Sequence, residues 1–177
     1  MKANQAWIKL IGDISLHGTH VSNGTLELIS NQSIIDMNYP IVTIPERKLN
    51  YKFMFGEAEW ILSGSNNVKH ISKYMKAISK FSDNGITFLD YVVCSLLTNP
   101  ASRQAVLNIW RENPRDTKDY PCTLNMQWII RNGKLNCITN MRSSDVWLGW
   151  VYDVFNFSMI SNYILIMLKK ELHHLKL

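Results

Sequence analysis

The sequence predicts an α+β protein in which a central mixed β-sheet packs against helices, in a single domain over 1–177. Apolar residues recur at helical spacing in the first hundred residues and again near the C-terminus. Between these regions, three segments alternate apolar and polar residues, as strands do. Two of them are joined by Asn132-Gly133, the strongest short signal for a β-hairpin. With 46% hydrophobic and 19% charged residues, the composition is that of a folded globular chain.

The first half of the chain is expected to be mainly helical. Thr43 as N-cap and Pro45 in the first turn predict the start of a helix that ends before Gly64. Cys94 lies among apolar residues of a later helix, which predicts a buried thiol. The elements predicted here are a strand over 24–30 and helices over 45–62, 67–81 and 87–97.

The helix over 45–62 carries an acidic residue on its apolar face. The residues that share this face at three-four spacing are Leu49, Phe53, Glu57, Trp60 and Ile61, whereas Glu59 points away. Because burial raises the pKa of a carboxyl group, Glu57 is a candidate for proton transfer. The alternative is that its carboxylate caps a buried backbone group.

Strands dominate the second half of the chain until its last helix. The predicted elements are strands over 103–110, 122–131 and 134–142, followed by a helix over 155–174. One face of the middle strand presents Leu124, Met126, Trp128 and Ile130. The pattern does not decide which face is the core, so Trp110 or Trp128 remains a candidate for a dimer surface.

The hairpin brings a cysteine close to an arginine. Counting outward from the two-residue turn places Cys122 opposite Ser143 and Thr123 opposite Arg142. A one-residue bulge at the turn would place Arg142 opposite Cys122 instead. In either register a guanidinium lies within reach of the thiol, and such a neighbour lowers a cysteine pKa and favours the nucleophilic thiolate. The alternative is a small core residue.

The net charge of +5 favours an anionic partner, either a phosphate-bearing small molecule or a nucleic acid. Because the basic residues are scattered, we do not expect a nucleic-acid partner. The cysteines and histidines show no metal-ligand spacing, so no metal is expected. We find no apolar run near ~20 residues and no signal-peptide core, so the expectations are no membrane partner and a reduced, cytoplasmic location.

Five segments, in order and spacing, carry a resemblance to the thymidylate synthase and dCMP hydroxymethylase superfamily. They are Phe55–Gly64, Pro100–Gln104, Pro121–Thr123, Met141–Gly149 and Tyr152–Asn156. The similarity runs from about Gly18 to Asn162 and is closer to the hydroxymethylase branch. It implies a thymidylate synthase-like fold and an enzyme that transfers a one-carbon unit to C5 of a pyrimidine nucleoside monophosphate.

The resemblance also implies roles for individual residues. Cys122 would add to C6 of the pyrimidine, after which C5 attacks the one-carbon unit of 5,10-methylenetetrahydrofolate. Glu57 would relay protons through water. Arg142 and Ser143 would bind the 5′-phosphate, and Asp145 would lie near both pyrimidine and folate.

The resemblance further implies a homodimer, in which Arg103 reaches the phosphate bound by the partner subunit. Gln104 stands where the family usually has a second arginine. His20 stands where an N-terminal phosphate arginine is usual.

Asp153 is expected to determine the choice of base. Thymidylate synthases have asparagine here, and hydroxymethylases have aspartate. An ionised carboxylate only accepts hydrogen bonds, so it suits the 4-amino group of cytosine. Thr123 after the cysteine also matches the hydroxymethylases. We therefore expect dCMP hydroxymethylation, with thymidylate synthesis on dUMP as the alternative and the choice of sugar left open.

The chain departs from the family in two places. It stops at Leu177, before the C-terminal part of the family fold, and relative to the family we expect a loop to be deleted between Phe88 and Leu89. We expect either a natural short form, such as a virus-encoded enzyme acting in the host cytoplasm, or a frameshifted remnant. A degenerate protein that binds nucleotides or dimerises without catalysis is the alternative of another class.

Overall fold

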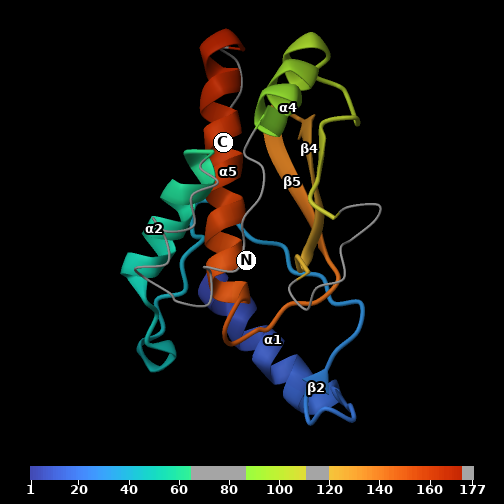
Figure 1. The fold of residues 1–177 in the computed structure, drawn as a ribbon, viewed down its shortest axis with the longest axis vertical. Helices are drawn as coiled ribbons and strands as arrows, with labels where there is room; N and C mark the ends of the chain where they lie inside the picture. The colour runs from blue at the N-terminus through green and yellow to red at the C-terminus, as the bar shows by residue number, and fades with distance from the viewer. Residues whose placement is uncertain (65–86, 111–119, 173–177) are drawn as a thin grey trace. The chain divides into compact units, whose positions relative to one another are not determined.

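The computed structural model describes residues 1–64, 87–110 and 120–172. It divides into two compact units, of which unit 1 comprises Met1–Asn50 and Asp145–Phe155. Unit 2 comprises Tyr51–Ser144 and Asn156–Leu177. Helices and small antiparallel sheets make up the fold (Figure 1), which confirms the predicted α+β class. One domain over 1–177 remains a prediction.

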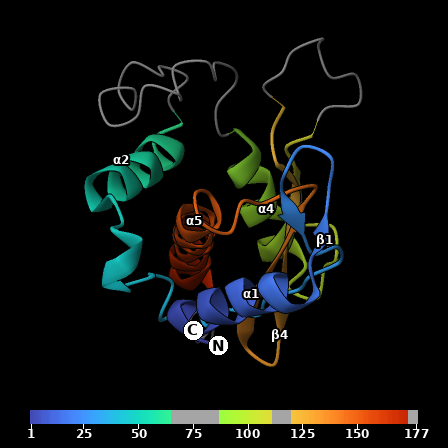
Figure 2. The ribbon, with the colours of Figure 1, turned by 90° about the horizontal axis from the view of Figure 1, so that it is seen from below.

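Unit 1 begins with a helix for which the sequence analysis made no prediction. Helix α1 spans Ala3–His17, and its buried residues are Ala3, Ala6, Trp7 and Leu10. This spacing is that of one helix face. A short antiparallel pair follows, with β1 at Thr19–His20 and β2 at Leu26–Glu27, and Figure 2 shows it beside the end of α1. The predicted strand over 24–30 is therefore reduced to two residues.

The predicted helix over 45–62 is interrupted. Its first part is a 3₁₀ turn, η1, at Pro45–Arg47, and α2 begins only at Tyr51 and ends at Leu62. Lys48 between them has φ +48° and ψ +53°, a left-handed conformation that cannot continue a right-handed helix. Thr43 does not cap the turn; instead its hydroxyl accepts a 2.9 Å hydrogen bond from Asn4 Nδ2.

Unit 2 contains a three-stranded sheet in the order β3-β4-β5. The strands are β3 at Val106–Asn108, β4 at Thr123–Arg131 and β5 at Lys134–Met141. Both pairings are antiparallel, so this sheet is not the mixed sheet that the sequence predicted. Asn132 and Gly133 have φ +53° and +69°, the paired positive values of the tight hairpin turn.

The core of unit 2 lies between the sheet and its helices. Helix α4 spans Thr87–Thr98 and α5 spans Trp150–Glu171. Figures 1 and 2 both show the unit 2 part of α5 between α2 and the sheet. Trp128 is fully buried there and donates a 2.9 Å hydrogen bond to Ser161 Oγ of α5. Trp128 is therefore a core residue and not part of a dimer surface, whereas Trp110 is half-buried.

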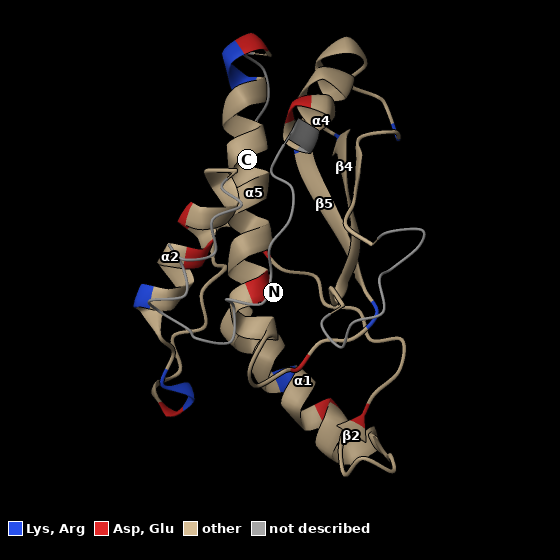
Figure 3. Cartoon of the chain, in the orientation of Figure 1, with Lys and Arg blue, Asp and Glu red and all other residues tan. Residues whose placement is uncertain are grey.

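Helix α5 is the long apolar helix that the sequence predicts, with a different start. It begins five residues before the predicted start at 155, and Figure 3 shows no charged residue in it between Asp153 and Lys169. By length and composition it is the described helix that could cross a membrane, although 61% of its apolar window is buried in the fold. Such burial is typical of a core helix, and the absence of a membrane partner stays a prediction.

Two further expectations concern the helices. The helix predicted over 67–81 lies outside the described residues. Cys94 is exposed on α4, contrary to the predicted buried thiol, while its neighbours Val92 and Val93 are buried. Each residue advances a helix by about 100°, so flanking apolar neighbours in sequence do not place a side chain on the buried face.

Candidate active site

The hairpin places Cys122 directly beside Arg142. The Arg142 N–H donates a 2.9 Å hydrogen bond to the Cys122 carbonyl, so the two residues are paired across the strand ends. Arg142 Nη2 lies 4.0 Å from Cys122 Sγ, at the long end of the range for a hydrogen bond to sulfur. The Cys122 side chain is exposed. A thiol in this position is accessible to a small molecule and has a cation at its side.

This pairing comes from a bulge. The turn pairs Arg131 with Lys134 as predicted, and the regular register continues to Asn125. It then shifts by one residue between Asn125 and Thr123, so Thr123 pairs with Met141. Of the two registers considered, the one that places Cys122 opposite Ser143 is wrong. The bulge produces the other, but it lies at the far end of the hairpin and not at the turn.

The Arg142 guanidinium is held by backbone carbonyls. Its Nε donates to Pro121 O at 3.0 Å, and its Nη2 donates to Tyr120 O at 3.1 Å. Its Cζ lies 5.8 Å from the centre of the Trp110 ring, within range for a cation–π contact. A guanidinium has five N–H donors, so these bonds orient the group and leave donors for an anion.

Half-buried Glu57 forms a second pair within unit 2, with a buried partner on α5. Its Oε2 accepts a 2.7 Å hydrogen bond from Nδ2 of Asn156, which is 5% exposed on α5. Burial raises the pKa of Glu57 above its usual range, and the hydrogen bond from Asn156 opposes part of that rise. Glu59 is exposed, as predicted. The hydrogen bond of this carboxyl is thus with a side-chain amide, and its role in proton transfer stays a prediction.

Asp145 and Asp153 belong to unit 1. Asp145 is exposed, and its Oδ1 accepts hydrogen bonds from the backbone N–H groups of Trp147 and Leu148, at 2.9 and 2.7 Å. Asp145 thus orders the turn that leads into α5. Asp153 is half-buried in the first turn of α5, where the positive end of the helix dipole favours a carboxylate.

The remaining predicted phosphate residues are exposed. Arg103 precedes β3, and its backbone carbonyl accepts a 2.7 Å hydrogen bond from Gln127 Nε2 of β4. Ser143 follows β5, next to Arg142. Gln104 and His20 are exposed as well. These positions leave the side chains accessible to an anion, and their roles remain predictions.

Sequence reasoning missed two residues with unusual environments. Asn156 enters the sequence analysis only as part of a motif, although an amide between two phenylalanines in a long apolar helix is a signal of a buried polar contact. Arg47 was counted as a scattered surface charge, but it is only 9% exposed. Within unit 1 its guanidinium carbon lies 5.9 and 5.5 Å from the ring centres of Trp147 and Tyr152.

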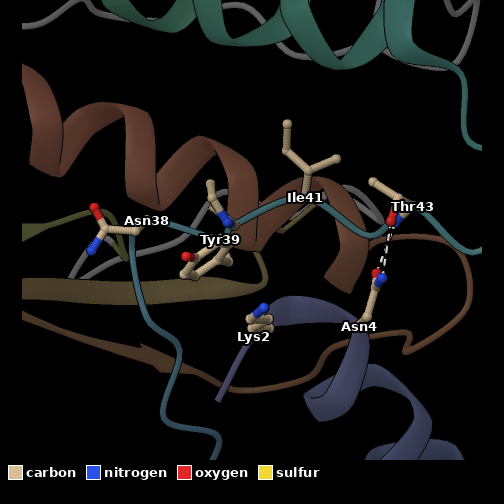
Figure 4. A pocket seen from close by; sticks show the side chains of 7 residues that line it. Lys2, Asn4, Asn38, Tyr39, Ile41 and Thr43 are labelled. Carbon is tan, nitrogen blue, oxygen red and sulfur yellow. Dashed lines mark hydrogen bonds between the residues drawn. The ribbon is translucent and has the colours of Figure 1, made fainter.

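A pocket of about 380 Å³ lies elsewhere in unit 1 (Figure 4). Its lining residues are Lys2, Asn4, Asn38, Tyr39, Pro40, Ile41 and Thr43. None of the predicted site residues lines it, and it contains neither a thiol nor a carboxylate. The Lys2 ammonium group lies 4.5 Å from the centre of the Tyr39 ring. The chemistry of the candidate site is therefore not that of this pocket.

In the described part of the chain, no three His, Cys, Asp or Glu side chains lie where they could hold a metal ion. Unit 2 contains a thiol beside a guanidinium and, in a separate pair, a half-buried carboxyl, and these groups suit nucleophilic addition and proton transfer.

Comparison with known proteins places this chemistry in a family. The family model described as thymidylate synthase matches residues 72–175, which is more than half of the chain. The chain therefore belongs to the thymidylate synthase family.

Individual relatives agree with this assignment. A thymidylate synthase from Francisella philomiragia is 24% identical over 180 residues, and the match covers 83% of this chain and 66% of that protein. The chain thus spans just under two thirds of the length of this relative. The structure of the thermostable thymidylate synthase A from Bacillus subtilis is similar with a TM-score of 0.70 and 24% identity, covering 93% of this chain and 73% of that one. The latter similarity shows the fold.

Proposed function

We propose that the protein transfers a one-carbon unit from 5,10-methylenetetrahydrofolate to C5 of a pyrimidine nucleoside monophosphate. Membership of the thymidylate synthase family supports this reaction class. The observation that carries the proposal is the exposed Cys122 thiol with the Arg142 guanidinium 4.0 Å from its sulfur. The net charge of +5 also favours an anionic substrate.

The nucleophilic step belongs to Cys122. Its thiolate adds to C6 of the pyrimidine ring, which raises the electron density at C5 and lets that carbon attack an electrophile. Arg142 stabilises the thiolate and, with its remaining donors, binds the 5′-phosphate together with Ser143. Arg103 binds the phosphate of the partner subunit in a homodimer.

The proton steps belong to Glu57. The reaction removes the proton from C5 of the pyrimidine, and a side chain of the protein must accept that proton. A carboxyl group whose pKa is raised by burial is a stronger base than an ordinary carboxylate, so it suits a step in which a proton is accepted and later released. Glu57 exchanges protons with the pyrimidine ring through water.

The folate supplies the one-carbon unit when it is bound. Trp147 and Leu148 are 46% and 64% exposed and lie two and three residues after Asp145 in unit 1. An exposed aromatic ring and an aliphatic side chain suit the flat face of a pterin, and a carboxylate suits its N–H groups. These three residues therefore fit the cofactor and would hold it.

For the base we propose cytosine, and hence dCMP hydroxymethylation. Asp153 supports this choice because an ionised carboxylate accepts from the 4-amino group but cannot donate to the O4 of uracil. The alternative is thymidylate synthesis on dUMP, which the names of the relatives favour. An unpaired buried polar group can discriminate between two such bases by several orders of magnitude.

The test is release of tritium from C5 of labelled dCMP and dUMP, with and without the folate. We expect release from dCMP that requires Cys122, and a product with a hydroxymethyl group at C5. Asp153→Asn should shift the preference toward dUMP. Tight, phosphate-dependent nucleotide binding without any tritium release would contradict the proposal and favour a non-catalytic nucleotide-binding protein.

A further inference from the structure

Asn156 is a buried polar residue that is only partly satisfied. It lies on α5 and is 5% exposed, and its Nδ2 donates the 2.7 Å hydrogen bond to Glu57 Oε2. Its Oδ1 is also buried and has no hydrogen-bond partner within the part of the chain that the structure describes. Leaving a buried acceptor without a donor costs free energy, so such a group in a native fold requires an explanation.

A neighbouring residue shows what a purely structural contact on the same helix looks like. Ser161 Oγ accepts from Trp128 Nε1 at 2.9 Å and donates to the Phe157 carbonyl at 2.8 Å. Its hydroxyl is therefore used both as donor and as acceptor. Asn156 donates a hydrogen bond to Glu57, but its own acceptor atom is not used by any described residue. Its hydrogen-bonding capacity is therefore only partly satisfied, whereas Ser161 both donates and accepts.

The chemistry of an amide explains the difference. An amide presents donors on one side and an acceptor on the other, and rotation by about 180° exchanges them. In the present orientation Asn156 donates to Glu57, which suits an ionised carboxylate. After rotation, Oδ1 would accept from the O–H of a protonated Glu57. One side chain can thus hold the carboxyl group in both of its protonation states.

We propose that Asn156 is a positioning residue that keeps the Glu57 carboxyl in one orientation while that group gains and loses a proton. The inference rests on the proposed function, in which Glu57 relays protons to and from the pyrimidine. A carboxyl group that turned away on each protonation change would have to be reoriented before the next transfer, which slows the step.

The experiment compares Asn156→Ala with Ser161→Ala, because each removes a side-chain hydrogen bond that joins α5 to another element of unit 2. We expect Asn156→Ala to lower kcat for C5 tritium release by about 10- to 100-fold, with KM for the nucleotide within about twofold. Ser161→Ala should lower stability but leave kcat within about twofold. Asn156→Ser, whose hydroxyl both donates and accepts, should restore part of kcat and also controls for a folding defect.

A double-mutant cycle separates positioning from a structural effect. If Asn156 acts through Glu57, Asn156→Ala should have no further effect on kcat in a Glu57→Gln background. As a readout independent of turnover, ¹³C NMR of labelled glutamate should show that Asn156→Ala raises the pKa of Glu57 further, because the opposing hydrogen bond is lost.

The outcomes distinguish the two proposals. No tritium release by the wild-type protein, with Cys122 shown to be reduced, would overturn the proposed function. Wild-type release that is unchanged in Asn156→Ala, or an equal loss of kcat in both Glu57 backgrounds, would overturn the role of Asn156 alone.

Discussion

The two side-chain pairs of unit 2 place reactive groups in contrasting ways. Cys122 and Arg142 are exposed at the end of a hairpin, and the strand register sets their positions. Glu57 and Asn156 join α2 to α5 in the interior, and burial sets the protonation behaviour of the carboxyl group. A nucleophile needs access and a nearby cation, whereas a proton relay needs a low dielectric constant. The fold supplies these conditions in different places.

The largest expected effect tests the exposed pair. We expect Cys122→Ser to lower tritium release from C5 by at least about 10³-fold, because a serine hydroxyl is a far weaker nucleophile than a thiolate. The matched control is Cys94→Ser, since Cys94 is also exposed but lies on α4. That variant should retain the wild-type rate within about twofold. Retained activity in Cys122→Ser would remove the thiol from the mechanism.

The next effect tests the buried pair. Glu57→Gln keeps the size of the side chain and a hydrogen-bond acceptor for Asn156 but removes the titratable group. We expect kcat to fall by about 10²- to 10⁴-fold, the usual contribution of general acid–base catalysis. Nucleotide binding, measured by calorimetry, should change little. A fall in affinity with no change in kcat would instead assign Glu57 to substrate binding.

Glu57→Gln is also expected to change the free energy of unfolding, by a smaller amount that depends on pH. Because burial raises the pKa of Glu57, the folded protein binds this proton more tightly than the unfolded chain does. The resulting stabilisation is complete below the unfolded pKa of about 4.3 and is lost as pH rises through the folded pKa.

The free energy of unfolding of the wild type should therefore fall relative to that of Glu57→Gln as pH rises through this window. Each unit of difference between the folded and unfolded pKa corresponds to about 1.4 kcal/mol. Urea unfolding of both proteins between about pH 4 and about pH 8 measures the difference. Parallel stability curves would show that Glu57 is not desolvated.

The contrast between the pairs also explains what could be predicted from sequence. A two-residue turn fixes which strand residues face each other, so counting from Asn132-Gly133 reached the neighbourhood of Cys122 and Arg142 correctly. The sequence contains no comparable signal for the position of the bulge. It forms where the Leu124 carbonyl accepts from the N–H groups of both Ile109 and Trp110. These two residues lie just after β3, outside the hairpin, so counting along the hairpin cannot locate the bulge.

The bounds of a helix were harder to predict where the conformation of a single residue interrupts it. The apolar stripe located Glu57 correctly, but the left-handed conformation of Lys48 that interrupts the predicted helix occurs at a residue type that rarely adopts it. Helix α1 was overlooked although Ala3, Trp7 and Leu10 have helical spacing. The hydrogen bond between Asn156 and Glu57 could not be predicted, because the sequence alone does not show which helices pack against each other.

The smallest expected effect tests whether the turn or the bulge controls the exposed pair. Gly133 has φ +69°, and no atom lies within 4 Å of the place where a Cβ would be added. Gly133→Ala should therefore cost about 1 kcal/mol through backbone conformation alone. The control is Gly12→Ala within α1, where the added Cβ also meets nothing within 4 Å. Because the helical conformation suits alanine there, this variant should stabilise the fold by about 0.5–1 kcal/mol.

Both glycine variants should retain the wild-type rate of tritium release within about twofold. The one-residue shift between Thr123 and Asn125 lies between the turn and Cys122, so the pairing of Cys122 with Arg142 is set locally by the bulge. A large loss of activity in Gly133→Ala, with a normal unfolding transition, would show that the turn transmits its register to the thiol. The exposed pair would then depend on the whole hairpin, and not on the hydrogen bonds that Leu124 accepts from Ile109 and Trp110.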